Sequence, residues 1–261
     1  MKKIILALSL LGFAQSAFAA VVGRDVEYKA GATVMKGFMA FDDSVKGKRA
    51  GVLVVPEWWG ANDYARKRAR MLAEAGYVAL VVDMYGEGKI AANPQEAGEL
   101  AGGVNKNPPL ALTRFQAAEK FLSRQPRVKQ GEMAALGYCF GGAVVLNMAR
   151  AGEPLKAVVS YHGVLATDVA VKPGAIQAKL RIFHGEADPV VPPEQVEAFK
   201  TEMNNAKADY KLVAYPGVKH TFTNREADSY AAQFNLPLKY DNAADTDSWA
   251  QTLTFLKATL K

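Results

Sequence analysis

The stretch Gly137-Tyr138-Cys139-Phe140-Gly141-Gly142 places the only cysteine of the chain between two glycines. An apolar run at residues 133–136 leads into it, and a helix-like apolar segment at residues 143–149 leads out. This order predicts a strand, a sharp turn and a helix, with the sulfur at the apex of a G-x-S-x-G nucleophile elbow in which cysteine replaces serine. Glycine suits the flanking positions, because a side chain there would clash where strand and helix pack closely. The alternative is a buried and inert cysteine, the usual state of a free thiol.

Two further residues follow in the order nucleophile, acid, base that accompanies this turn. Asp188 lies in a loop directly after the strand-like residues 180–183, and His220 follows a second strand-like segment at residues 211–215. Open α/β sheets place their sites at such carboxyl ends of strands. The helix N-terminus behind Cys139 also favours a thiolate. The sequence therefore predicts a Cys139–His220–Asp188 triad.

The other two of the three histidines also end strand-like segments. His184 precedes the candidate acid, and we expect it to be a hydrogen-bonded scaffold residue. His162 could line the pocket without taking part in the chemistry. His220 is the base candidate because it alone follows Asp188.

Taken together, Gly-Tyr-Cys-Phe-Gly-Gly, His-Gly-Glu-Ala-Asp-Pro and His-Thr-Phe resemble motifs of the dienelactone hydrolase family of α/β hydrolases. A fourth match, Val-Val-Pro-Glu-Trp-Trp-Gly, occupies residues 54–60, and the resemblance extends from about residue 25 to residue 261. It implies the α/β-hydrolase fold and a Cys-His-Asp triad. It also implies that Glu57 contacts the cysteine and that the backbone N–H of Trp58 forms part of the oxyanion hole. The second expected donor is the N–H of Phe140, the residue after the nucleophile.

The expected reaction is hydrolysis of a lactone or carboxylic ester, a small-molecule substrate, through an acyl group carried on Cys139. His220 would act as the base, and Asp188 would orient it. Glu57 would either partner the thiol or form a structural salt bridge. Three large aromatic residues are expected to wall the substrate pocket: Trp58, Trp59 and Tyr85. We expect no metal and no cofactor.

One segment departs from the family pattern. Members that bind dienelactone hold its carboxylate with an arginine just after an Asp-Leu-Tyr-like segment, whereas this chain reads Asp83-Met84-Tyr85-Gly86-Glu87. Lys89 and Arg225 are candidates to replace that arginine. The resemblance therefore does not fix the natural substrate, and a general esterase or thioesterase on the same triad is an alternative.

Two alternatives from other functional classes remain. Cys139 could serve a thiol redox or peroxide-sensing protein, although the chain has no second cysteine to resolve an oxidised sulfur. A non-catalytic binding module on a hydrolase fold is disfavoured by the complete set of triad residues.

Residues 1–19 have the features of a signal peptide. Lys2 and Lys3 precede an apolar run at residues 4–13, and Ala17-Phe18-Ala19 forms a small-residue cleavage site. Cleavage there would leave residues 20–261 as one periplasmic or secreted domain. The apolar run is too short to span a bilayer, so we expect no stable membrane association.

The charge pattern does not favour nucleic acid as a partner. The 261 residues carry a formal net charge of +6, and the basic residues are scattered rather than interleaved with aromatics on one patch. No sequence feature sets the oligomeric state.

Short apolar strands alternate with helical segments, which predicts a mainly parallel sheet covered by helices on both faces, with an antiparallel N-terminal strand pair. The expected strands are residues 26–28, 34–41, 51–55, 78–82, 133–136, 157–160, 180–183 and 211–215. The expected helices are residues 64–75, 110–123, 143–149, 193–203 and 246–260. Residues 91–109, which contain Gly, Asn and Pro, are expected to be irregular or short-helical.

Overall fold

The computed structural model describes residues 21–167 and 171–261. The predicted signal peptide, residues 1–19, lies outside the described residues. The strands are β1 (Val21–Ala30), β2 (Thr33–Asp42), β3 (Arg49–Val55), β4 (Val78–Val81), β5 (Val128–Tyr138), β6 (Ala157–Tyr161), β7 (Lys179–Gly185) and β8 (Tyr210–Tyr215). The helices are α1 (Asp63–Glu74), α2 (Pro94–Asn105), α3 (Pro108–Ser123), α4 (Phe140–Arg150), α5 (Pro193–Asn205), α6 (Ala227–Phe234) and α7 (Asn242–Thr259).

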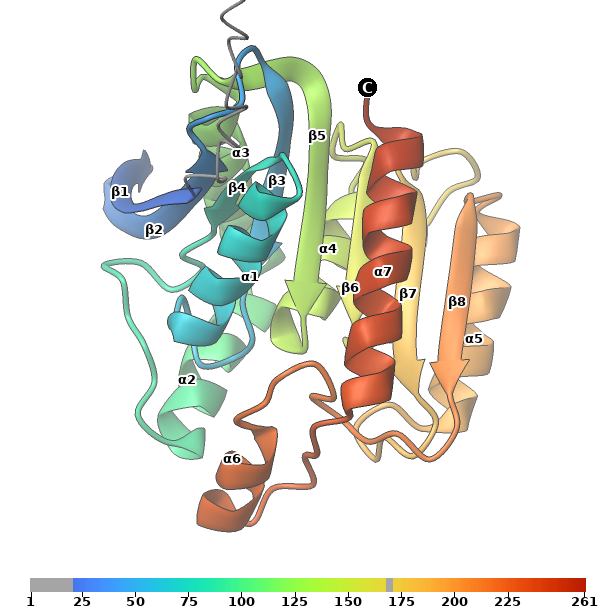
Figure 1. Cartoon of the computed structure of the whole chain (residues 1–261). Helices are drawn as coiled ribbons and strands as arrows, with labels where there is room; N and C mark the ends of the chain where they lie inside the picture. Colours follow the sequence, from blue (N-terminus) through green and yellow to red (C-terminus); the bar gives the residue numbers. More distant parts are fainter. Residues whose placement is uncertain (1–20, 168–170) are drawn as a thin grey trace, which may run out of the picture.

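These eight strands form one sheet in the order β1-β2-β4-β3-β5-β6-β7-β8 (Figure 1). The β1–β2 and β2–β4 pairs are antiparallel, and the pairs from β4 through β8 are parallel. The predicted sheet with its antiparallel N-terminal pair is confirmed. The chain passes from β3 to β4 on one side and then to β5 on the other, so β3 and β5 flank a topological switch point. Ligand sites of open α/β sheets lie at such points.

Alternating side chains of the central strands fill two cores. Val52 and Val54 face the core under α1 and α7, whereas Leu53 and Val55 face the core under α3, α4 and α5. Figure 1 shows the same division, with α1 and α7 on the near face of the sheet. Parallel strands buried on both faces read as continuous apolar runs, which is why the sequence predicted them.

Two helices differ from the expectation. Residues 91–109 contain the 12-residue helix α2, which begins with Pro94 at N1 after the N-cap Asn93, whose side chain accepts from the N–H of Glu96. Helix α6 was not predicted. It ends at Asn235 in the left-handed conformation, so it is a short helix closed by a turn residue. Both helices lie beyond the carboxyl ends of the central strands (Figure 1).

The excursion that carries α6 begins and ends at the same place. His220 forms a parallel bridge with Leu238, and its carbonyl accepts from Lys239 N at 3.1 Å. Asp241 N donates to Phe222 O at 3.0 Å. The backbone of His220 is therefore braced by the segment that leads into α7.

None of the helices in the described ranges, 21–167 and 171–261, combines the length and the apolar character needed to cross a membrane.

Candidate active site

Cys139 lies at the apex of a strained turn between β5 and α4. It is the N-cap of α4 with φ 52° and ψ −116°, a conformation that costs a non-glycine residue on the order of 1–3 kcal/mol. A Cβ atom at Gly137 would lie 2.0 Å from Gly141 O, and one at Gly141 would lie 2.2 Å from Val55 O. The glycines are required because strand, helix and the end of β3 pack backbone to backbone. The elbow predicted from the sequence therefore has its physical basis in this packing.

The three candidate triad residues converge from three strand ends. His220 Nε2 lies 3.1 Å from Cys139 Sγ, and His220 Nδ1 lies 2.6 Å from Asp188 Oδ2. Asp188 Oδ1 accepts from the N–H of Val190 at 2.8 Å, so both of its oxygens have partners. The side chains of His220 and Asp188 are almost completely buried. This geometry matches a nucleophile, a base and an orienting acid.

The environment of His220 favours its protonated form. Burial alone would lower the pKa of this imidazole, but the charges and hydrogen bonds of Cys139 and Asp188 outweigh burial and raise it to about 10. His220 and the N-terminus of α4 both lie at the sulfur, an environment of the kind in which cysteines are reactive.

Two backbone N–H groups near the elbow are free to bind an oxyanion. Within the described ranges, neither Phe140 N nor Trp58 N donates a hydrogen bond to another residue. The turn that presents Trp58 is closed by Gly60 N donating to Glu57 O at 3.0 Å. Tyr85 Oη donates to Trp58 O at 2.8 Å and so fixes this turn from the other side. Both predicted donors thus lie on constrained backbone.

Glu57 lies deep in the site but is not hydrogen-bonded to the cysteine. Its Oε2 accepts from Asn224 Nδ2 at 2.8 Å, and its Oε1 is buried without a hydrogen-bond partner. Burial raises the pKa of Glu57 to about 7, against the opposing effects of Asn224, His220 and Arg68. Within residues 21–167 and 171–261 it forms no salt bridge, so the structural salt bridge weighed from the sequence is not found among them. Asn224 gave no sequence signal, because its role depends on a residue 167 positions away.

The three predicted pocket aromatics occupy different places. Tyr85 is buried with its ring 5.7 Å from that of Phe140, and Trp58 is partly exposed. Trp59 is buried and packs in a tilted arrangement against Tyr230 and Phe234 of α6, at centroid distances of 4.7 and 5.9 Å. It belongs to the small core that attaches α6 and α2. Its place in the substrate pocket stays a prediction, because this ring is packed against α6.

The two remaining histidines also depart from expectation. His162 Nδ1 accepts from the N–H of Cys139 at 3.1 Å, which is closer to the chemistry than a residue that only lines the pocket. His184 is mostly buried, but its ring makes no hydrogen bond within residues 21–167 and 171–261, so the hydrogen-bonded role predicted for it was wrong.

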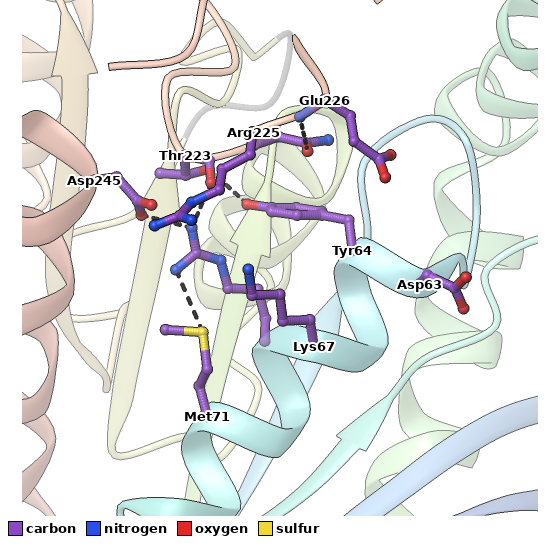
Figure 2. A pocket seen from close by; sticks show the side chains of 10 residues that line it. Asp63, Tyr64, Lys67, Met71, Thr223, Arg225, Glu226 and Asp245 are labelled. Atoms are coloured by element: carbon purple, nitrogen blue, oxygen red, sulfur yellow. Dashed lines mark hydrogen bonds and ion pairs between the residues drawn. The ribbon is translucent and has the colours of Figure 1, made fainter. Parts of the chain in front are cut away.

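A cavity of about 280 Å³ lies beside the loop that carries His220 (Figure 2). Residues of α1, residues 223–226 and Asp245 line it, and Cys139 is not part of the lining. Arg225 lines this cavity, with its guanidinium 5.7 Å from the centroid of the Tyr240 ring. Lys89 is exposed. In the part of the chain that the structure describes, the side chains of Lys89 and Arg225 form no hydrogen bond, ion pair or cation–π contact with Cys139, Trp58 or Tyr85.

The sequence model of the dienelactone hydrolase family matches residues 35–260. The chain belongs to the dienelactone hydrolase family. Among solved structures it is similar to P91, described as a dienelactone hydrolase-like promiscuous phosphotriesterase from metagenomic libraries. The TM-score is 0.88 at 34% sequence identity, covering 94% of this chain and all of that one.

Curated relatives agree with this membership. Protein usf of Aquifex pyrophilus is 27% identical, over 90% of this chain and 98% of its own. A Yersinia pestis protein named as a carboxymethylenebutenolidase is 26% identical, over 76% of this chain and 78% of its own. The chain is therefore an α/β hydrolase that acts on ester or lactone bonds of small molecules.

Proposed function

We propose that this hydrolase works by covalent catalysis through Cys139, with His220 as base and Asp188 as its orienting partner. The observation that carries the proposal is the continuous contact from Cys139 Sγ through both His220 ring nitrogens to Asp188, at 3.1 and 2.6 Å. The strained elbow supports it, because such backbone conformations gather where a reactive atom is presented.

The reaction begins when the Cys139 thiolate attacks the carbonyl carbon of the substrate and the oxygen becomes an oxyanion. The N–H groups of Phe140 and Trp58 bind that oxygen, a contribution of roughly 2.7–4 kcal/mol per donor. Collapse of this tetrahedral intermediate breaks the carbon–oxygen bond of the ester or lactone. The alkoxide that leaves takes the proton from His220. His220 then removes a proton from water, and the hydroxide attacks the thioester and releases the acid and the thiolate.

Substitution of the nucleophile tests this mechanism. Cys139→Ala is expected to abolish measurable hydrolysis, and iodoacetamide should inactivate the wild type with labelling at Cys139. Cys139→Ser should retain little activity, because a hydroxyl needs stronger base assistance than a thiol. Full activity in the alanine variant would contradict covalent catalysis at this sulfur.

The substrate panel should separate the candidate acyl classes. We propose a lactone or carboxylic ester as the natural class, so lactones and simple esters form its core, with thioesters as the alternative on the same triad. A phosphotriester belongs in the panel because P91, 34% identical to this chain, is described as a promiscuous phosphotriesterase. Turnover of peroxide without any ester or lactone hydrolysis would favour the redox alternative.

We further propose that residues 1–19 are a signal peptide and that the mature enzyme is periplasmic or secreted. The basic start, the apolar run and Ala17-Phe18-Ala19 support this. Mass spectrometry of the native protein should find Ala20 as the first residue, and an intact segment from Met1 would contradict export by this route.

A further inference from the structure

His162 is a buried residue that directly follows β6 and contacts both Cys139 and His220. Its backbone has φ 40°, and its N–H donates to Phe183 O at 2.8 Å. Its Nδ1 accepts from the N–H of Cys139 at 3.1 Å. The same N–H also donates to Tyr161 O at 3.0 Å, so it has two acceptors. Its ring lies edge-on to the His220 ring, with centroids 5.2 Å apart. One side chain therefore supports the nucleophile's backbone and abuts the base.

The hydrogen-bond network assigns the protonation of this ring. Because Nδ1 accepts a backbone N–H, the single proton of the neutral ring lies on Nε2. Nε2 lies 2.8 Å from Thr223 Oγ1 and so donates to it, and Thr223 Oγ1 lies 2.6 Å from Tyr64 Oη (Figure 2). Burial, together with the charges of His220 and Arg68, lowers the pKa of His162 well below its usual range. The neutral ring that the geometry requires is thus the stable form.

We propose that His162 is a positioning residue: its Nδ1 fixes the backbone of Cys139 at the elbow, and Thr223, held by Tyr64, keeps its proton on Nε2. The inference rests on the proposed role of Cys139 as nucleophile. A residue at positive φ is held only where its surroundings over-determine it, and the second acceptor for the Cys139 N–H is part of that restraint. The direction of Sγ and of the following Phe140 N–H depends on this backbone.

Three variants test this series of hydrogen bonds, two at His162 and one at Thr223. His162→Leu removes both ring bonds and should lower kcat about 10- to 100-fold, since small misplacements of reacting groups cost up to about 100-fold. His162→Asn keeps an acceptor near Nδ1 and should recover part of that loss. Thr223→Val leaves Nε2–H without an acceptor and should lower kcat about 3- to 10-fold, with KM within about twofold. The rate of Cys139 alkylation by iodoacetamide should fall in the same order.

The chain offers a matched control in Thr252. This buried threonine of α7 also pairs its hydroxyl with a tyrosine hydroxyl, Tyr161 Oη, at 2.5 Å. It contacts the ring of Tyr161, whereas the Cys139 N–H is bound by the backbone carbonyl of Tyr161. Thr252→Val should lower the thermal midpoint about as much as Thr223→Val does, while kcat and the alkylation rate stay at wild-type values. Equal kcat in Thr223→Val and Thr252→Val, or unchanged alkylation in His162→Leu, would overturn the proposal.

The alkylation readout separates this inference from the proposed mechanism. If Cys139→Ala keeps full hydrolysis, covalent catalysis fails, whereas the effect of His162 and Thr223 on the reactivity of the Cys139 thiol is still measured directly. If Cys139→Ala is inactive and alkylation is unchanged in both His162 variants, the mechanism stands and the positioning role fails.

Discussion

The loop after β7 and the loop after β3 each bring one carboxyl group to the same buried site, but the two groups differ in their hydrogen-bond partners. Asp188 has a partner for each oxygen, His220 Nδ1 and Val190 N–H. Glu57, only 2% exposed, has Asn224 for one oxygen and nothing for the other. Burial raises the pKa of Glu57 to about 7.

The difference shows that burial alone does not determine what a buried carboxyl group does. Where each oxygen has a hydrogen-bond partner, the carboxyl group is held in one orientation, which suits a residue that orients a histidine. Where one oxygen is left unpaired, neutral and charged forms come close in free energy near neutral pH. Asp188 is therefore built as a fixed acceptor and Glu57 as a group that can change charge.

The largest expected effect separates the two loops by activity. Asp188→Asn should lower kcat by up to about 10⁴-fold with little change in fold, because the amide favours the wrong tautomer of His220. Glu57→Gln should lower it far less. The measurement is steady-state hydrolysis of one ester by both variants, with circular dichroism to check folding. Unchanged hydrolysis in Asp188→Asn would contradict the assignment of Asp188 to the triad. It would also contradict the difference in role drawn between Asp188 and Glu57.

The second expected effect is on stability as a function of pH. The pKa of Glu57 is raised from 4.5 to about 7, so the native state keeps a proton that the unfolded chain has lost between these values. The free energy of unfolding of the wild type should therefore fall as pH rises from about 4.5 to about 7, by up to about 3 kcal/mol from this group. Glu57→Gln should lack this fall.

Denaturant unfolding at about pH 5 and about pH 8 measures this difference. The gain of Glu57→Gln relative to wild type should be larger at the higher pH, whatever constant cost the buried amide adds. An equal gain at both values would mean that Glu57 does not titrate between them.

The smallest expected effect is on the reactivity of the thiol. Above about pH 7 the charged Glu57 disfavours a thiolate nearby, so Glu57→Gln should raise the alkylation rate of Cys139 a few-fold there and change it little below. Identical alkylation profiles against pH for the two proteins would make Glu57 a scaffold residue. Asn224→Ala sharpens the test, because losing its hydrogen bond should move the step in the profile to higher pH.

Much of this fold could be predicted from the local pattern of apolar residues and glycines. Apolar strands and the glycines around Cys139 are dictated by packing within a few residues, so the elbow and the parallel sheet were predicted. Helix α2 was underestimated because three glycines lower its helix propensity, whereas its N-cap Asn93 and Pro94 decide that it forms. The contacts of His162 and Asn224 were not predictable, since each depends on a partner distant in sequence.

Trp59 is another residue whose contacts could not be predicted from its neighbours in the sequence. A large aromatic residue beside a candidate oxyanion residue is expected to line the pocket. The ring packs against Tyr230 and Phe234 of α6, a helix that was not predicted from the sequence. The direction of a side chain in a tight turn depends on what packs against it.

The brace between His220 and the segment that returns from α6 makes that excursion a replaceable module. Its two ends are tied together by the His220–Leu238 bridge and by the bond from Asp241 N to Phe222 O, so the base is anchored at the root of the loop rather than along it. Changes in length between residues 226 and 236 are therefore expected to leave the base in register and to act first on the contacts of Tyr230 and Phe234 with Trp59.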